Sequence, residues 1–272
     1  MTTYDYETHG PVELSVELAK GRLTIDTTES NHAHIEISGR DADRVRVQQR
    51  GDRLDIADPN ARRPFSFSHL DITVVVPAAS GLALRTGTAE VEVTGTVGAA
   101  VVHTGTGPVR LDHVAGSAAV QSGSGAVTIA SVDGDLRAKS GSGDITVGTA
   151  QDAVVVSTGS GDVAVRTANG PITVKTGNGD LRVAEAHGDV SLTTGSGSLE
   201  VGNAHRGRVV GKAASGHIRV GIPAGTPVWT DITTLTGHIR SGLRPVGQPL
   251  EGQGHVELRA RTVSGDVTLV EV

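Results

Sequence analysis

Three aspartates recur at intervals of eighteen residues, each directly after a Gly-x-Gly turn: Asp144, Asp162 and Asp180. If each interval stacks one coil of the chain on the next, these carboxylates stand about 4.8 Å apart, close to the roughly 5 Å that separates the carboxylates of a retaining glycosidase. The regular coils, however, contain no aromatic ring on which a sugar could stack. Aspartate in a turn ordinarily accepts backbone N–H groups, and we expect that role here.

The same turns invite comparison with calcium-binding β-rolls, whose repeat is G-G-x-G-x-D-x-U-x. The position that a calcium ligand needs holds Ile145, Val163 and Leu181 instead. The carboxylates also do not persist along the aspartate column, which elsewhere holds Glu90, Pro108, Ala126, Ser198 and His217. Because calcium requires six to eight oxygen ligands, the sequence predicts no calcium site.

Two pairs of histidines share equivalent positions of the repeat: His187 with His205, and His217 with His238. Imidazoles on neighbouring coils can share a zinc or nickel ion, but two ligands without a carboxylate or a third histidine form an incomplete site. No phosphate-loop, dinucleotide-binding, G-x-S-x-G or H-E-x-x-H motif occurs. We therefore expect no catalytic residue, no metal site and no cofactor, and the sequence does not identify the binding residues.

The elements that carry these residues follow from the repeat. The second turn glycine recurs every eighteen residues, with Ala89 in its place one interval earlier and looser spacing after residue 197. The regular members are Gly107, Gly125, Gly143, Gly161, Gly179 and Gly197. A fixed period of this kind is typical of a solenoid.

The phase of the apolar residues gives the cross-section of a coil. Val163 and Val165 face inward with Ala164 opposite, and Ile172 and Val174 repeat this nine residues later. Each coil therefore has two strands and two turns. We expect an all-β fold, a right-handed parallel β-solenoid with eighteen-residue, two-strand coils.

Two polar or small columns should line the turns. One runs through Thr86, Thr104, Ser122, Ser140, Thr158, Thr176 and Thr194, whose hydroxyls are expected to form a ladder. The other is all glycine, at Gly87, Gly105, Gly123, Gly141, Gly159, Gly177 and Gly195, and is expected to adopt positive φ.

The ends of the chain break the regular pattern. We predict an N-terminal β section and cap over residues 1–83, and solenoid repeats with irregular C-terminal coils over residues 84–272. Loops are expected over residues 59–68 and 244–254. The aromatic residues all fall outside the regular coils and are expected to cover open strand edges: Tyr4, Tyr6, Phe65, Phe67 and Trp229.

Charge and composition exclude several classes of partner. The formal net charge is −6, with nine basic and 13 acidic residues in 1–83 and 15 and 17 in the remainder, so neither part predicts a nucleic-acid or anionic-lipid platform. There is no cysteine. The first residues lack the features of a signal peptide and no apolar run is long enough to span a bilayer, so we expect a cytoplasmic protein.

The T-G-[SN]-G-[DS]-[VIL]-x-[VL] units, the entry "VVVPAASGLAL" and the closing "VSGDVTLVEV" resemble a bacterial family of putative adhesins of unknown function. The resemblance covers about residues 12–272. It implies a β-solenoid used for binding or for roles associated with the cell envelope, and it brings no catalytic residues.

Our first interpretation is a non-enzymatic interaction or scaffold module that binds a protein partner along a solenoid face, as a monomer or small oligomer. The alternative is a polymer-forming cytoskeletal scaffold resembling bactofilins, and the third interpretation is a glycan-acting enzyme.

Overall fold

The computed structural model describes residues 1–61, 69–244 and 254–272. The described residues contain 27 strands and one short 3-10 helix, η1 (Ala42–Arg44). They fall into two compact units, residues 1–135 and residues 136–272. The all-β solenoid that the repeat predicts is confirmed, and each unit is described by itself.

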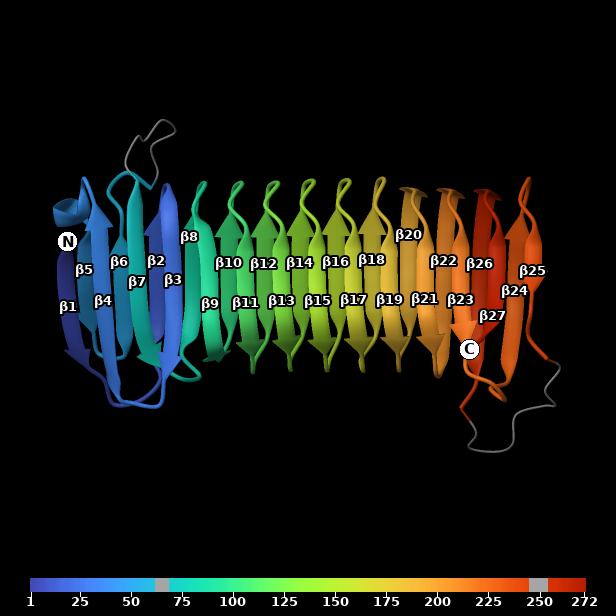
Figure 1. The fold of residues 1–272 in the computed structure, drawn as a ribbon, viewed down its shortest axis with the longest axis horizontal. Helices are drawn as coiled ribbons and strands as arrows, with labels where there is room; N and C mark the ends of the chain where they lie inside the picture. Colours follow the sequence, from blue (N-terminus) through green and yellow to red (C-terminus); the bar gives the residue numbers. More distant parts are fainter. Residues whose placement is uncertain (62–68, 245–253) are drawn as a thin grey trace. The chain divides into compact units, whose positions relative to one another are not determined.

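Residues 136–272 alternate between two parallel sheets that face each other across a shared core (Figure 1). Sheet A2 has, in spatial order, β15 (Ile145–Ala150), β17 (Val163–Ala168), β19 (Leu181–Ala186), β21 (Leu199–Ala204), β23 (Ile218–Ile222), β27 (Val267–Glu271) and β25 (Ile239–Ser241). Sheet B2 has β14 (Leu136–Ser140), β16 (Val154–Thr158), β18 (Ile172–Thr176), β20 (Val190–Ser196), β22 (Gly207–Ser215), β26 (Val256–Ser264) and β24 (Val228–Thr234).

The strand register confirms the eighteen-residue coil. Val163 of β17 pairs with Ile145 on one side and with Leu181 on the other, each eighteen residues away. Val163 and Val165 are 1% and 2% exposed, whereas Ala164 between them lies on the outer surface and is partly exposed. The core is therefore made of alternate residues from the two sheets, as the phase of the repeat predicts.

The turn glycines recur in successive coils for a reason that differs from the expected one. None of the column from Gly87 to Gly195 is among the glycines with positive φ, so that expectation is wrong. A Cβ at Gly105 would lie 2.6 Å from the carbonyl oxygen of Gly87, and one at Gly177 would lie 2.5 Å from that of Gly159. Glycine is required because successive turns stack with their backbones in contact.

The hydroxyl column is present, but its hydroxyls bond to backbone groups and not to one another, so they do not form the expected ladder. Thr104 and Ser122 donate to the carbonyl oxygens of residues three further on, and Thr158 and Thr176 accept from the N–H groups three further on. Four of the seven hydroxyls thus close their own turns. Thr194 donates instead to the carbonyl oxygen of Gly177 in the preceding coil, and the hydroxyls of Thr86 and Ser140 have no partner among the described residues.

Residues 1–135 contain the same winding and an antiparallel end (Figure 1). Sheet A1 has, in spatial order, β1 (Thr2–Glu7), β4 (His32–Gly39), β7 (Leu70–Pro77), β3 (Gly21–Thr28), β9 (Glu90–Val97), β11 (Val109–Val114) and β13 (Val127–Val132). Sheet B1 has β5 (Arg46–Arg50), β6 (Arg53–Ala57), β2 (Glu13–Leu18), β8 (Gly81–Thr86), β10 (Ala100–Thr104) and β12 (Ala118–Ser122). The antiparallel pairs of this unit are β1 with β4, β4 with β7, and β5 with β6.

Parallel winding begins before the visible repeat. The coil of β2 and β3 lies between the coil of β6 and β7 and that of β8 and β9, so the chain must cross over it after Pro77. Buried Ser80 fixes this crossing, because its hydroxyl donates to the carbonyl oxygen of Pro77 and accepts from the N–H of Val12. Ala79 beside it has a φ of 62°.

The aromatic residues divide between two outcomes. Tyr4 and Tyr6 lie on β1, the outermost strand of sheet A1, which agrees with a role in the N-terminal cap. Trp229 does not cover an edge, since it is 54% exposed on β24 beneath the guanidinium of Arg259, 5.8 Å from its ring centroid. Phe65, Phe67 and most of both predicted loops lie outside the described residues. Among the described residues, no helix has the length and apolar character needed to cross a bilayer.

Candidate functional site

The aspartate column acts as backbone hydrogen-bond acceptors, as expected. Asp144 Oδ1 accepts the N–H of Asp162 at 2.9 Å, and Asp162 Oδ1 accepts that of Asp180 at 2.8 Å. Asp180 does the same for Ser198 at 2.8 Å. Each carboxylate therefore fastens the next coil, which is a structural task.

Sheet B2 carries an excess of positive charge that the net charge of the chain conceals. Its seven strands hold seven basic and two acidic side chains. The basic ones are Arg137, Lys139, Lys175, Arg208, Lys212, Arg259 and Arg261, and the acidic ones are Glu257 and Asp231. We call the outer surface of this sheet the cationic face. The strands of sheet A2 are balanced, with four basic and three acidic residues.

Both acids of the cationic face are already paired. Glu257 binds Arg208 at 2.7 Å and Arg259 at 2.6 Å, and it has a lowered pKa because Arg208, and then Arg259, donate hydrogen bonds to it. Asp231 lies 3.9 Å from Arg261. Arg137, Lys139, Lys175 and Lys212 have no ion pair with any other described residue, so their charges are available to a partner.

The three lysines occupy one column of the cationic face. Lys139 is followed in register by Ser157, Lys175, Thr193 and Lys212 on successive strands. At about 4.8 Å for each strand, the lysines recur about every 9.6 Å. A hollow of about 470 Å³ lies at the Lys212 end, lined by Lys212, Ala213, Thr233, Arg261, Thr262 and Val263.

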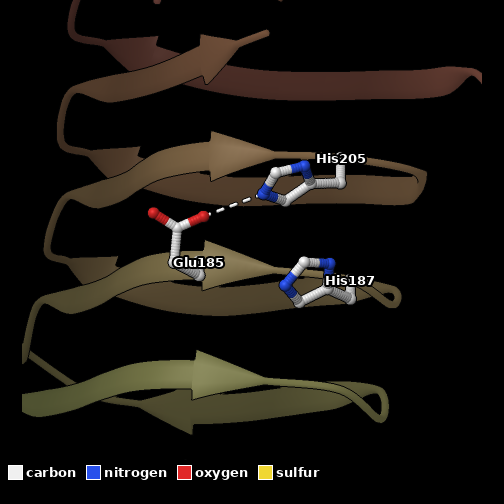
Figure 2. A group of neighbouring side chains, drawn as sticks. All are labelled: Glu185, His187 and His205. Carbon is white, nitrogen blue, oxygen red and sulfur yellow. Dashed lines mark hydrogen bonds and ion pairs between the residues drawn. The ribbon is translucent and has the colours of Figure 1, made fainter.

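A second cluster lies at the turns that follow sheet A2 (Figure 2). Glu185 is near the end of β19, and His187 and His205 sit in the turns after β19 and β21. The imidazoles stack, with ring centroids 4.3 Å apart and an interplanar angle of 11°, and Glu185 Oε2 lies 2.8 Å from His205 Nε2. The hydrogen bond from His205, and next the one from Asn203, lower the pKa of Glu185.

The expectation that His187 and His205 form a pair without a nearby carboxylate is wrong, because Glu185 lies beside both imidazoles. Glu185 precedes His187 by two residues and faces outward, so its side chain shares the corner with both imidazoles. The spacing of twenty between Glu185 and His205, one coil plus two residues, was the available signal.

The other histidine pair does not form such a cluster. His217 Nδ1 accepts the N–H of Asp266, whose Oδ1 accepts the N–H of His238. The ring of His238 lies 3.5 Å from the same carboxylate. His217 and Asp266 therefore act as Asp180 and Ser198 do, since each side chain accepts a backbone N–H from the neighbouring coil.

The parallel coils and the structural use of the aspartates together define a β-solenoid, and one of its sheets, B2, carries the cationic face. Residues 15–204 match the family described as "Putative auto-transporter adhesin, head GIN domain". The chain belongs to this family, as its repeat units indicated. No curated protein sequence matches the chain.

Solved structures of three bacterial proteins are similar to this chain. A putative adhesin from Parabacteroides merdae is 13% identical, with a TM-score of 0.51, over 100% of this chain and 95% of that one. A putative adhesin from Bacteroides fragilis is 14% identical (TM-score 0.38; 99% and 96%). A putative lipid binding protein from Parabacteroides distasonis is 13% identical (TM-score 0.35; 100% and 96%). The first likeness supports the solenoid fold.

Proposed function

We propose that the protein is a non-enzymatic interaction module that binds the acidic surface of a protein partner through the cationic face. The observation that carries the proposal is the segregation of charge, seven basic against two acidic residues on sheet B2 with both acids neutralised by arginines. Complementary charge of this kind accelerates association and selects partners.

Apolar groups among the cations favour a protein partner. Val155 on β16 is 46% exposed, between strands that carry Arg137 and Lys175, and Trp229 is 54% exposed. Tryptophan and arginine are enriched among the residues that dominate protein–protein binding energy. Family membership agrees with a binding role.

The aspartate column supports the absence of catalysis. A retaining glycosidase needs one carboxylate as a nucleophile and another as an acid, whereas Asp144, Asp162 and Asp180 each hold a backbone N–H. We propose that Asp162→Asn and Asp180→Asn leave partner binding intact.

The test compares two charge-reversal variants of the full chain. One changes Lys139, Lys175 and Lys212 to glutamate on the cationic face. The matched control changes Arg166, Arg219 and Arg240 to glutamate on sheet A2, which alters the net charge equally. Each is immobilised and exposed to a lysate of the bacterium that makes the protein, and captured proteins are quantified at low and at high salt.

The lysine variant should lose a specific protein partner at least tenfold, equivalent to about 1.4 kcal/mol, while the control retains it. Capture by the wild type should weaken with salt, because exposed charges are screened. Equal capture by both variants would remove the cationic face from the proposal. Capture of nucleic acid or lipid alone would replace the protein partner with that class.

A polymer-forming scaffold is the second candidate, and one observation favours it. β24 and β25 are the outermost strands of their sheets, and no described strand pairs with their outer edges. Leu235 and Ile239 beside these edges are 77% and 52% exposed. Uncovered edges are templates for pairing with another chain. Filaments of the intact protein, dispersed by Ile239→Lys, would establish this function.

A further inference from the structure

We propose that Glu185, His187 and His205 form a binding site for a divalent transition metal, with zinc as the ion that their donor atoms fit best. This inference is independent of the partner-binding proposal, because the cluster lies at the turns after sheet A2 and not on the cationic face. Among the described residues, this is the one group of three such side chains whose ligand atoms all lie within 4.8 Å of one another.

The donor set suits zinc. Two imidazole nitrogens and one carboxylate oxygen form a common three-ligand set that leaves a fourth position for water or another ligand. Tetrahedral bonds of about 2.0–2.1 Å place neighbouring ligand atoms about 3.3 Å apart. Glu185 Oε2 and His205 Nε2 are 2.8 Å apart, so a small rotation of either side chain admits the ion in place of the shared proton.

The stacking of adjacent coils brings the three ligands together without any insertion in the repeat. His187 and His205 occupy the same position of adjacent coils, and their rings stack at 4.3 Å (Figure 2). Glu185 rises beside them from the end of β19. Two coils therefore present three ligands to the same point outside the turn.

Neighbouring groups orient the ligands. Asn203 donates its side-chain N–H to Glu185 Oε1 at 2.6 Å, which leaves Oε2 directed toward the imidazoles. Arg206 donates Nε–H to the carbonyl oxygen of His187 at 2.8 Å and braces that turn. Such outer hydrogen bonds are typical of metal sites, where they fix the ligand orientation.

The chain contains a natural comparison in residues 1–135. His113 and Asp133 occupy the repeat positions of Glu185 and His205 with the residue types exchanged, and they are joined at 3.0 Å. The position equivalent to His187 is Ala115, which directly follows Val114 at the end of β11. Alanine has no side-chain atom that could bind a metal ion. One imidazole and one carboxylate do not complete a zinc site, so this pair should not bind the ion.

The test is a titration of metal-free full-length protein with Zn²⁺. Calorimetry measures the binding, and nitrogen-15 NMR spectra report the imidazole signals. Three variants are compared with the wild type: His187→Asn, His205→Asn and Glu185→Gln. Asparagine already occupies the same column at Asn169, so the fold accommodates it. The control is His113→Asn, and circular dichroism verifies that each variant is folded.

The wild type should bind one Zn²⁺ per chain with a micromolar or lower dissociation constant, shifting two imidazole signals that disappear in the respective variants. Each of the three variants should weaken binding at least tenfold, and the control should not. Absence of binding to the wild type would overturn the site, as would unchanged binding by the His187→Asn and His205→Asn variants. The NMR shifts in the wild type decide the matter even if a variant fails to fold.

Discussion

The turn glycines act between coils, because a Cβ on one turn would collide with the carbonyl of the turn before it. Their N–H groups use the same closeness: Gly177 donates to the carbonyl oxygen of Gly159 at 2.9 Å. The parallel ladder thereby continues from the strands into the turn. This contact explains an all-glycine column that lacks positive φ.

Gly177→Ala should therefore destabilise the protein by about 1–3 kcal/mol, since the added Cβ would force two stacked backbones apart. Gly242→Ala is the control, because its Cβ would lie no closer than 3.6 Å to its nearest neighbour, the carbonyl oxygen of Leu269. Thermal unfolding of both variants measures the difference. Equal melting temperatures would show that stacking contact is not what requires glycine.

Adjacent residues of β17 should respond in opposite ways to the same change. Val163→Asp would place an unpaired charge in the core and should cost several kcal/mol, about 2–5. Ala164→Asp should have almost no effect, because this position faces outward and pairs in register with Arg182. Urea unfolding of both variants tests this. A large loss of stability with Ala164→Asp would contradict the two-sheet phase.

At the scale of the element, β1 is joined to β4 by an ion pair that responds to pH. His34 Nδ1 lies 2.6 Å from Asp5 Oδ1 on β1, and Nε2 lies 3.3 Å from Glu36 Oε1. These hydrogen bonds, with Asp5 the larger contributor, raise the pKa of His34, and burial opposes them weakly. The folded state thus favours the protonated imidazole.

A raised folded-state pKa makes the stabilisation complete below the ordinary histidine pKa of about 6.5 and removes it as pH rises through the raised value. The melting temperature of the wild type should therefore fall more than that of His34→Gln between pH 6 and pH 9. Parallel curves for the two proteins would show that this pair contributes nothing to the docking of β1.

The ends of the winding follow one rule in both units. The first coil in the sequence, formed by β2 and β3, lies between the coil of β6 and β7 and the coil of β8 and β9. The coil nearest the C-terminus, β26 and β27, likewise lies between β22 and β23 on one side and β24 and β25 on the other. Both terminal coils are therefore paired on both edges, which protects them from fraying.

At the scale of the whole molecule, stability should be graded along each unit, because every coil of a solenoid contacts only its neighbours. Hydrogen exchange should be fastest in β1 and β5 within residues 1–135 and in β24 and β25 within residues 136–272. It should be slowest in coils paired on both sides, such as β17 and β18. Uniform exchange across a unit would indicate all-or-none opening and contradict the nearest-neighbour description.

Most of the coil could be predicted from the sequence, because a repeat determines its own neighbours. Once Val163 is followed by Leu181 at the same phase, stacking fixes strand direction, register and the inward face. The role of Asp162 followed in the same way, since the residue eighteen further on must lie above it. The repeat units also indicated the family to which the chain belongs.

The tertiary structure decided what the repeat does not encode. The order of the end coils depends on where the chain crosses over, at Ser80, and not on local pattern. The reason for glycine at Gly177 is a contact between coils, which the conformational preference of one residue does not reveal. The cationic face appeared only when outward positions of seven strands were assembled, because the sequence alternates them with the balanced strands of the other sheet. Glu185 joined His187 and His205 for the same physical reason: outward side chains of adjacent coils converge at a corner whose curvature only the folded backbone sets.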